Sequence, residues 1–374
     1  VPEEADRIPG VIYDASPSRT VTVEVTDAGH DGQEMVAQIV KDDSDELVFN
    51  NRYDTTSTEL IGETSLEVTK DLTGRDWLDT DSFTFTLKAD PDEEDQTTQN
   101  AIDKEIVKLP GNASGLTIGA DTEGYKAAFG NITFTEPGTY HFVVAEQHAG
   151  ETINGITYDD AVKHVIVNVT DNKDGTLSAE LDENSDALEF KNTYDTQSTT
   201  LNGEENLEVT KNFTGRPDNK WLDGDKFSFS IAAKDQTTQD AVNNNIVKMP
   251  ASSVITVDKD NHTAAFGDIT FTEPGTYTFT VKEEPGKISG VAYDKSEKTV
   301  TVEVKDNKDG TLKAQIVKAA TDELTFSNTY DTTSTELNGE TSLTVTKDFT
   351  GRENGWLEDD AFTFTLAADP DDQT

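Results

Sequence analysis

One segment of the sequence occurs three times and limits what the chain can fold into. Each copy has an asparagine near its start and a lysine at its end, and 19 residues separate the two every time (70 − 51, 211 − 192, 347 − 328). The pairs are Asn51 and Lys70, Asn192 and Lys211, and Asn328 and Lys347. The residues between them vary while the spacing does not, so we expect the asparagine and the lysine to serve one structural purpose.

Apolar and polar residues alternate around these positions, which is typical of a half-buried β-strand because successive side chains point to opposite faces. Phe190, Asn192 and Tyr194 share one face of such a strand, and Val209 and Lys211 share one face of the next. The other two copies repeat this arrangement. An uncompensated buried ammonium group is very costly, so a lysine that points with apolar residues needs a chemical reason.

A third polar residue lies on the apolar face of the strand that follows a Pro-Gly turn. It is Glu146 in one repeat and Glu283 in the next. Glu3 takes the equivalent place near the start of the chain, because residues 1–4 align with residues 281–284. Each complete repeat therefore places one lysine, one glutamate and one asparagine on its apolar face.

The repeat length divides the chain into four parts. Tyr53 and Tyr194 are 141 residues apart, and Tyr194 and Tyr330 are 136 apart, which is enough for each repeat to bury its own core. We predict the end of one repeat at residues 1–54, complete repeats at 55–195 and 196–331, and the start of another at 332–374. We expect the sequence to be a section of a longer tandem array.

Short alternating strands, frequent turns and little helical pattern predict an all-β chain of immunoglobulin-like β-sandwiches. The segments between repeats are polar but short, so we expect a rod with limited bending. The Asp-Asn-Lys-Asp-Gly segments at 171–175 and 306–310 fit hairpin turns better than calcium loops, because they lack the spaced acidic ligands and the closing glutamate of an EF-hand.

The composition limits the partners and the compartment. A net charge of −44 with 33% hydrophobic residues is close to that of disordered chains, but the sustained alternation indicates folded acidic modules. This charge disfavours nucleic acid and anionic membranes as partners. We find no signal peptide and no apolar run long enough to cross a membrane. The chain has no cysteine. If the protein is extracellular, it lacks the disulfide bonds that usually stabilise such proteins, and another kind of cross-link could take their place.

Lysine, glutamate and asparagine together can make an amide bond. Burial lowers the pKa of a lysine and raises the pKa of a glutamic acid, so the amine can be neutral and nucleophilic while the acid is protonated. We expect the acid to donate to the asparagine side-chain carbonyl and to move protons. Attack on the asparagine Cγ then releases ammonia, in a single turnover that needs no cofactor and no metal.

Three recurring motifs carry a resemblance to a known family: Leu-Glu-Val-Thr-Lys, Ile-Thr-Phe-Thr-Glu-Pro-Gly-Thr-Tyr, and Phe-Lys-Asn-Thr-Tyr or Phe-Ser-Asn-Thr-Tyr. The chain resembles the isopeptide-linked repeats of Gram-positive shaft pilins and surface adhesins. The resemblance implies tandem immunoglobulin-like (CnaB/pilin-type) domains in an elongated array, each with an autocatalytic Lys–Asn bond that an acid assists.

Residue by residue, the resemblance implies one bond from Lys70 to Asn192 with Glu146 as the acid. It implies a second bond from Lys211 to Asn328 with Glu283 as the acid. Glu3 and Asn51 belong to a repeat whose lysine is not in this sequence, and Lys347 belongs to one whose glutamate and asparagine are not.

The resemblance also implies a structural stalk outside the cell, at the cell surface or in the cell wall. The partners of each repeat are then its neighbours in the same chain, with sortase and the cell wall acting through segments outside this sequence. We find no LPxTG sorting signal and no clear sortase-acceptor lysine, so a single long adhesin fits as well as a pilus subunit.

Other functions stay open at this point. The repeats could bind a host protein or glycan, for which a differing exposed apolar patch would be evidence. Calcium could rigidify the array, and chelators would then lower its stability. A hydrolase that uses the carboxylates would need an open cleft, whereas a stalk needs a closed core. For a single residue, a lysine that reaches out of the core or an asparagine that caps a turn is the more common explanation.

Overall fold

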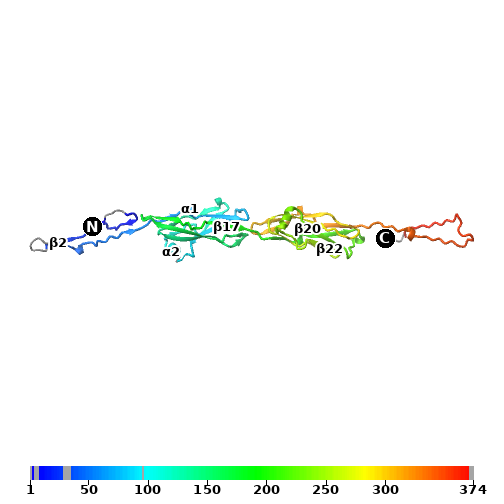
Figure 1. The fold of residues 1–374 in the computed structure, drawn as a ribbon, viewed down its shortest axis with the longest axis horizontal. Helices are drawn as coiled ribbons and strands as arrows, with labels where there is room; N and C mark the ends of the chain where they lie inside the picture. Colours follow the sequence, from blue (N-terminus) through cyan, green and yellow to red (C-terminus); the bar gives the residue numbers. More distant parts are fainter. Residues whose placement is uncertain (1, 4–7, 28–34, 95–96, 370–374) are drawn as a thin grey trace.

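The computed structural model describes residues 2–3, 8–27, 35–94 and 97–369. Two β-sandwiches follow one another along the long axis of an elongated molecule, and the two end segments extend beyond them (Figure 1). We call the sandwich built from residues 58–194 unit one and the sandwich built from residues 199–330 unit two. This is the all-β, tandem immunoglobulin-like architecture that the sequence predicts.

Unit one contains two five-stranded sheets and a smaller three-stranded sheet. The first sheet has the order β10 (Lys126–Ala128), β6 (Glu67–Thr73), β17 (Glu189–Tyr194), β14 (Ile156–Thr157) and β13 (Thr152–Ile153). The second has the order β16 (Leu177–Leu181), β15 (Val162–Asp171), β12 (Gly138–Glu146), β7 (Ser82–Ala89) and β9 (Leu116–Gly119). The smaller sheet joins β5 (Thr58–Leu60), β11 (Ile132–Phe134) and β8 (Val107–Lys108).

Unit two repeats this topology, except that its first sheet has four strands and no counterpart of β13 among the described residues. Its first sheet has the order β23 (Thr263–Ala265), β19 (Glu208–Thr214), β29 (Thr325–Tyr330) and β26 (Val291–Ala292). The second has the order β22 (Val254–Asp258), β20 (Lys226–Ala233), β25 (Gly275–Glu283), β27 (Glu297–Asp306) and β28 (Leu312–Ile316). The smaller sheet joins β18 (Thr199–Leu201), β24 (Ile269–Phe271) and β21 (Val247–Lys248).

In both units the first and last long strands of the unit are neighbours and run parallel. β6 pairs with β17, and β19 pairs with β29, while the other strand pairs of these sheets are antiparallel. The chain therefore enters a unit at one end of this pair and leaves it at the other end. Force applied along the molecule would act on this pair in shear.

The core lies between the two larger sheets. The rings of Phe85 on β7 and Phe190 on β17 lie 5.0 Å apart, and Phe229 and Phe326 repeat this contact in unit two at the same distance. Alternation in the sequence explains the packing, because every second side chain of β17 is buried and the residues between are exposed. The hydrophobic effect then holds the sheets together with side chains from one face of each sheet.

Helices are short and lie at the margins of the sheets. They are α1 (Gly62–Ser65), α2 (Thr97–Asp103), α3 (Gly203–Asn206), α4 (Gln236–Asn243) and α5 (Gly339–Ser342). α2 and α4 occupy equivalent segments of the two units, both rich in Gln, Thr and Asn. Asp235 caps α4, because its side chain accepts a hydrogen bond from the Thr238 amide at 2.8 Å. Among the described residues, no helix is long and apolar enough to cross a membrane.

The end segments depart from the prediction. At the N-terminal end, β1 (Val11–Ile12) pairs with β4 (Arg52–Tyr53), and β2 (Val23–Asp27) pairs with β3 (Met35–Ile39). The strand predicted around Asn51 is confined to β4, and the one predicted around Lys347 is wrong, because residues 343–350 form no strand.

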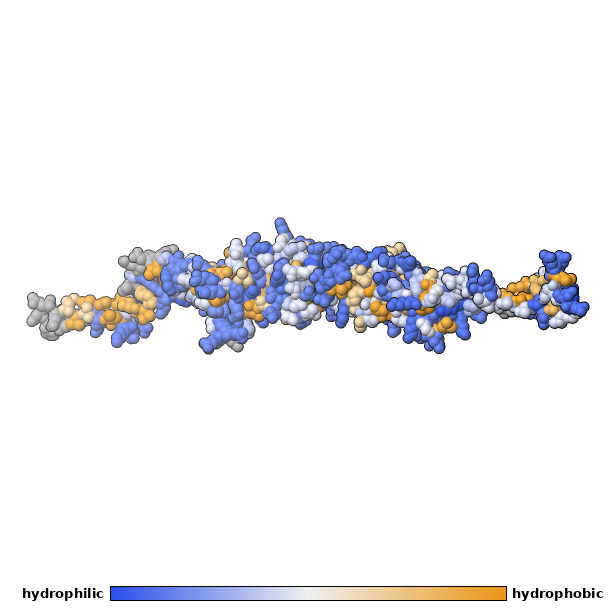
Figure 2. Space-filling model, turned by 45° about the vertical axis from the view of Figure 1, so that its right-hand side comes forward, coloured by the Kyte–Doolittle hydropathy of each residue, from blue (hydrophilic) through white to orange (hydrophobic). Residues whose placement is uncertain are grey.

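Missing neighbours explain these two corrections. β6 lies between β10 and β17, whereas the segment around Lys347 has no such strands beside it in the described part of the chain, and a lone strand is not stable in water. Apolar side chains of both ends stay exposed, with Val345 at 60% and Met35 at 65%. Figure 2 shows hydrophobic residues gathered at both ends of the molecule.

Candidate isopeptide site

Lys70, Glu146 and Asn192 meet in the core of unit one. Lys70 Nζ donates to Glu146 Oε2 at 2.8 Å, and Asn192 Nδ2 donates to Glu146 Oε1 at 2.9 Å. Lys70 and Asn192 come from the neighbouring parallel strands β6 and β17, and Glu146 ends β12 in the facing sheet. One carboxylate therefore bridges the two layers and holds the lysine and the asparagine on its two oxygens.

Unit two builds the same cluster from Lys211, Glu283 and Asn328. Lys211 Nζ donates to Glu283 Oε2 at 2.8 Å, and Asn328 Nδ2 donates to Glu283 Oε1 at 2.7 Å. Each of the three comes from the strand that is equivalent to its counterpart in unit one. The cluster is therefore a feature of the repeat and not of one unit alone.

Strand register brings the lysine and the asparagine together. In the parallel pair, Phe190 lies opposite Lys70, and Asn192 lies opposite Leu72. Residues two apart share a face, so Lys70 and Asn192 are diagonal neighbours on the core side of the sheet. A shift of the register by one residue would turn either side chain toward solvent.

The clusters are closed to solvent. The side chains of Lys70 and Glu146 have 0% exposed area, as do those of Lys211 and Glu283. The rings of Phe83 and Phe227 lie beside the two amines, with Nζ 5.0 Å from the ring centre in each unit. An open cleft, which a hydrolase built on these carboxylates would need, is therefore absent at both clusters.

Burial shifts the pKa values of the buried pair in the direction that favours its neutral form. It lowers the pKa of the Lys70 amine, although the hydrogen bond and the charge of Glu146 act against this. It raises the pKa of the Glu146 carboxyl, again against the opposing effect of its partner. It also lowers the pKa of Lys211. Loss of hydration penalises the charged form of each group, which is the physical cause of all three shifts.

The asparagine carbonyl has a partner that the sequence reasoning missed. The Asp159 backbone N–H donates to Asn192 Oδ1 at 2.8 Å, and the Asp294 N–H donates to Asn328 Oδ1 at the same distance. A backbone N–H can only donate, so it fixes which end of the amide is oxygen. The expected hydrogen bond from the acid to the carbonyl is therefore not formed: the glutamate faces the amide nitrogen instead.

The side-chain carboxylate of Asp159 fixes the position of its backbone by accepting hydrogen bonds from nearby amides. Asp159 accepts hydrogen bonds from the Lys191 and Ala161 amides at 2.7 and 2.9 Å. A recurring Gly-x-x-Tyr-Asp motif at residues 10–14, 155–159 and 290–294 was the available signal. The motif alone does not point to the site, because the functional atom is a backbone N–H that no residue type reveals.

At the two ends of the chain, only some of the contacts of the cluster are formed. Asn51 Nδ2 donates to Glu3 Oε1 at 2.5 Å, and the Asp14 N–H donates to Asn51 Oδ1 at 3.0 Å. This half-site lacks only the lysine. Lys347 is exposed, and its Nζ donates to the Asp348 carbonyl at 3.0 Å.

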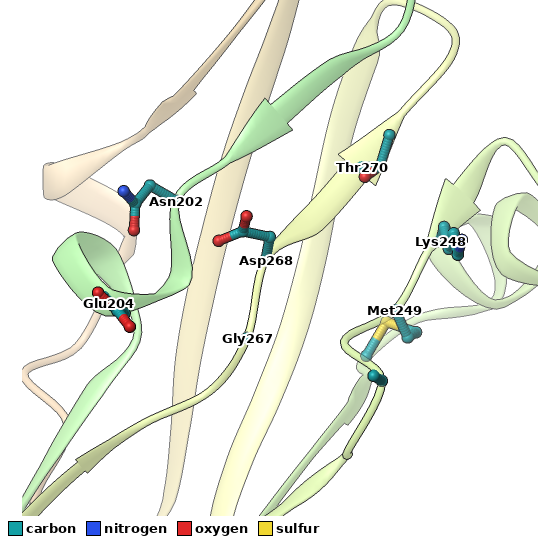
Figure 3. Close-up of a pocket in the computed structure, with 8 residues that line it drawn as sticks. Asn202, Glu204, Lys248, Met249, Gly267, Asp268 and Thr270 are labelled. Carbon is teal, nitrogen blue, oxygen red and sulfur yellow. The ribbon is translucent and has the colours of Figure 1, made fainter.

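The surface of unit two has a hollow beside α3 and β24. Figure 3 shows polar side chains around it from α3 and β24 and the turns beside them, and Met249 beside Lys248. The polar groups serve local structure: Asn202 Oδ1 accepts from the Glu205 amide, and Asp268 Oδ1 accepts from the Gly203 amide. Within the described residues, no group of three or more His, Asp or Glu side chains is placed to hold a metal ion.

Fold and site together define a class of protein: tandem immunoglobulin-like β-sandwiches, each with a buried Lys–Glu–Asn cluster between its first and last strands. The sequence matches the family described as Spy0128-like isopeptide containing domain (FctA) over residues 1–54, 66–195 and 207–331. The chain belongs to this family. The resemblance found from the sequence motifs is thereby confirmed.

Solved structures similar to this chain include major pilins of Streptococcus pyogenes and Corynebacterium diphtheriae. The major pilin from Streptococcus pyogenes is 13% identical, with a TM-score of 0.24, over 74% of this chain and 99% of that one. Another major pilin from the same species, T-13, is 19% identical, with a TM-score of 0.24, over 73% and 98%. The major pilin SpaD from Corynebacterium diphtheriae is 13% identical, with a TM-score of 0.17, over 69% and 64%. At these TM-scores the likeness supports no conclusion, and the assignment rests on the family match. No curated protein sequence matches the chain significantly.

Proposed function

We propose that the chain is part of a structural stalk of a bacterial surface adhesin or pilus, and that each complete unit carries an intramolecular isopeptide bond. The bonds join Lys70 to Asn192 and Lys211 to Asn328. One observation carries the proposal: in both units a single buried carboxyl group holds the lysine amine and the asparagine amide side by side. The unit boundaries at residues 55–195 and 196–331 belong to the same proposal.

The chemistry proceeds within the folded unit. The neutral Lys70 amine attacks Asn192 Cγ, the new Nζ–Cγ bond forms, and the Cγ–Nδ2 bond breaks. Nδ2 leaves as ammonia after it gains a proton, and Nζ loses one. Glu146 lies within 3 Å of both nitrogens, so it can give its proton to Nδ2 and take one from Nζ. Atoms balance with no other reactant, and the carboxyl group returns to its starting form.

The Asp159 N–H supports the same step from the other side of the amide. Negative charge develops on Asn192 Oδ1 when the amine attacks, and a fixed N–H donor at this oxygen stabilises that charge. The surrounding apolar side chains exclude water, which strengthens this interaction. Holding the reacting groups in contact replaces a bimolecular encounter. Each unit thus acts once on itself, and the chain is not a turnover enzyme.

The position of the bond suits a stalk under tension. Lys70 and Asn192 lie on the two strands that force along the molecule would load in shear. A covalent bond between these strands would carry the tension past the intervening residues. Neighbouring repeats are the partners of each unit in this proposal, and the location is extracellular, at the cell surface or wall. Sortase and the cell wall would act through segments outside this sequence.

Intact mass of the purified chain tests the proposal directly. We expect a mass lower than that of the plain sequence by two ammonia molecules, one for each complete cluster. Proteolysis should then release branched peptides that join the Lys70 segment to the Asn192 segment and the Lys211 segment to the Asn328 segment. A mass equal to that of the plain sequence would show that no bond forms.

A further inference from the structure

The hairpin turn between β15 and β16 contacts the segment that precedes unit one. The Tyr53 hydroxyl donates to Asp171 Oδ1 at 2.8 Å, and the Gly175 N–H donates to the Tyr53 hydroxyl oxygen at 3.0 Å. The Thr56 N–H donates to the Gly175 carbonyl at 2.9 Å. The turn that the sequence predicts as a plain hairpin therefore receives the last tyrosine of the preceding repeat.

The equivalent turn of unit two receives the last tyrosine of unit one in the same way. The Tyr194 hydroxyl donates to Asp306 Oδ1 at 2.7 Å, and the Gly310 N–H donates to the Tyr194 oxygen at 3.0 Å. The Gln197 N–H donates to the Gly310 carbonyl at 2.8 Å. Tyr194 is only 4% exposed, so its hydroxyl is withdrawn from water and depends on these partners.

Two glycines allow the backbones to approach at this junction. Gly155 and Gly310 have φ values of +80° and +82°, and a Cβ added to Gly310 would lie 2.6 Å from the Gly155 Cα. Any other residue would be strained by the backbone angle and would also push the two units apart. Gly10 and Gly175 make the same contact at the preceding junction.

The tyrosine that inserts into the turn is positioned by contacts within its own unit. The Arg75 guanidinium lies 4.8 Å from the centre of the Tyr194 ring, and Arg216 lies 4.7 Å from that of Tyr330 at the far end of unit two. The Asp195 N–H donates to the Gly155 carbonyl, and the Asp331 N–H donates to the Gly290 carbonyl. Unit two therefore builds the arrangement around Tyr330 although no hairpin turn lies against Tyr330 among the described residues, so the arrangement is a property of the unit itself.

We propose that the tyrosine and the Asp-Asn-Lys-Asp-Gly turn form a specific interface between consecutive repeats, which fixes the angle between them. The partner that this surface fits is another repeat of the same kind. The contacts are directional: two hydrogen bonds at one hydroxyl, one backbone hydrogen bond and one glycine–glycine approach. They set both tilt and rotation, which a flexible linker would leave free.

Distances between spin labels on the two units test this interface. The chain has no cysteine, so Lys108→Cys and Lys248→Cys place labels at two exposed, equivalent sites, one on each unit. Pulsed electron spin resonance should give one narrow distance distribution for this labelled parent. Tyr194→Phe keeps the ring but removes both hydroxyl hydrogen bonds, and Gly310→Ala blocks the close approach. Each should broaden the distribution and shift it toward shorter distances.

Tyr53→Phe is the matched control, because it removes the same hydroxyl at the other junction and should leave the distribution unchanged. Thermal unfolding of each variant shows whether both units are still folded. An unchanged distribution in both Tyr194→Phe and Gly310→Ala would overturn the proposal. So would equal broadening in Tyr53→Phe, or a parent distribution that is already as broad as those of the variants.

Discussion

Replacing Lys70 with methionine removes the amine that the proposed bond in unit one requires, while it keeps a side chain of similar length in the core. Asn192→Ala removes the other partner and leaves the contact between Lys70 and Glu146 in place. Under tension, unit one of either variant should unravel, whereas unit two should stay closed. Lys211→Met should give the reverse result.

The size of the effect follows from the sequence separation. Lys70 and Asn192 are 122 residues apart (192 − 70) but lie side by side in the fold. A chain extends by at most about 3.3–3.6 Å per residue, so the residues between them hold roughly 400 Å of length that the bond would hide. The bond would also stabilise the unit through its unfolded state by about 5 kcal/mol, by analogy with a disulfide that closes a loop of this length.

Single-molecule pulling measures this length. The parent chain should show no extension step of about 400 Å from either complete unit. Lys70→Met and Asn192→Ala should each add one step of that size. The double variant Lys70→Met with Lys211→Met should add two steps, one from each unit. Lys88→Met is the control, because Lys88 is an exposed lysine on β7 in the same unit, and it should add none.

Two results of the pulling experiment would contradict these roles. A parent chain that lengthens by about 400 Å per unit, at forces typical of sandwiches without a cross-link, would refute the load-bearing role. A Lys70→Met chain that shows the same trace as the parent would refute the assignment of Lys70. A variant unit that extends without a force peak would be unfolded at the start, and Asn192→Ala would then decide the matter.

The cluster and the Arg75–Asp81 ion pair of the same unit give three further tests. Glu146→Gln should leave unit one folded but without its bond, so intact mass should show the loss of one ammonia instead of two; a loss of two would mean that another group moves the protons. Burial lowers the pKa of Lys70 and raises that of Glu146, so bond formation should slow at acid pH, where the amine is protonated, and at alkaline pH, where the acid is ionised. Intact mass can follow the rate in chain that is recovered in denaturant before it has folded and formed its bonds, and is then folded by dilution; a rate independent of pH would contradict this. Arg75 makes two hydrogen bonds to Asp81 at 2.7 and 2.9 Å, so Arg75→Met should lower the free energy of unfolding of unit one by about 3 kcal/mol in a denaturant titration, because Asp81 would lose its buried partner. Burial alone would raise the pKa of Asp81, but its hydrogen bonds lower the pKa overall. The ion pair therefore contributes to the stability of unit one at pH values above the pKa that Asp81 has in the unfolded chain. This contribution is lost as the pH falls through the lower pKa that Asp81 has in the folded unit.

Much of the fold and of the cluster could be predicted from alternation. Val68, Lys70 and Leu72 are the buried residues of β6, and Phe190, Asn192 and Tyr194 are those of β17, as the period of two predicts. Glu146 is buried at the end of β12 for the same reason. Alternation is a local property of the sequence, so it predicts the buried face of a strand in any sheet that buries one face. It also identifies the three polar residues that lie on an otherwise apolar face.

Contacts that join separate parts of the chain depend on the folded arrangement and have no local pattern in the sequence. The Asp159 N–H at the asparagine carbonyl is a backbone contact, and every residue except proline carries such a group, so the sequence could not single it out. The interface of Tyr194 with Asp306 depends on how one unit meets the next. The strand expected around Lys347 did not form, because a strand needs neighbours as well as a pattern. Alternation in the sequence settles which side chains turn inward, whereas the pairing of strands more than a hundred residues apart settles what those side chains meet.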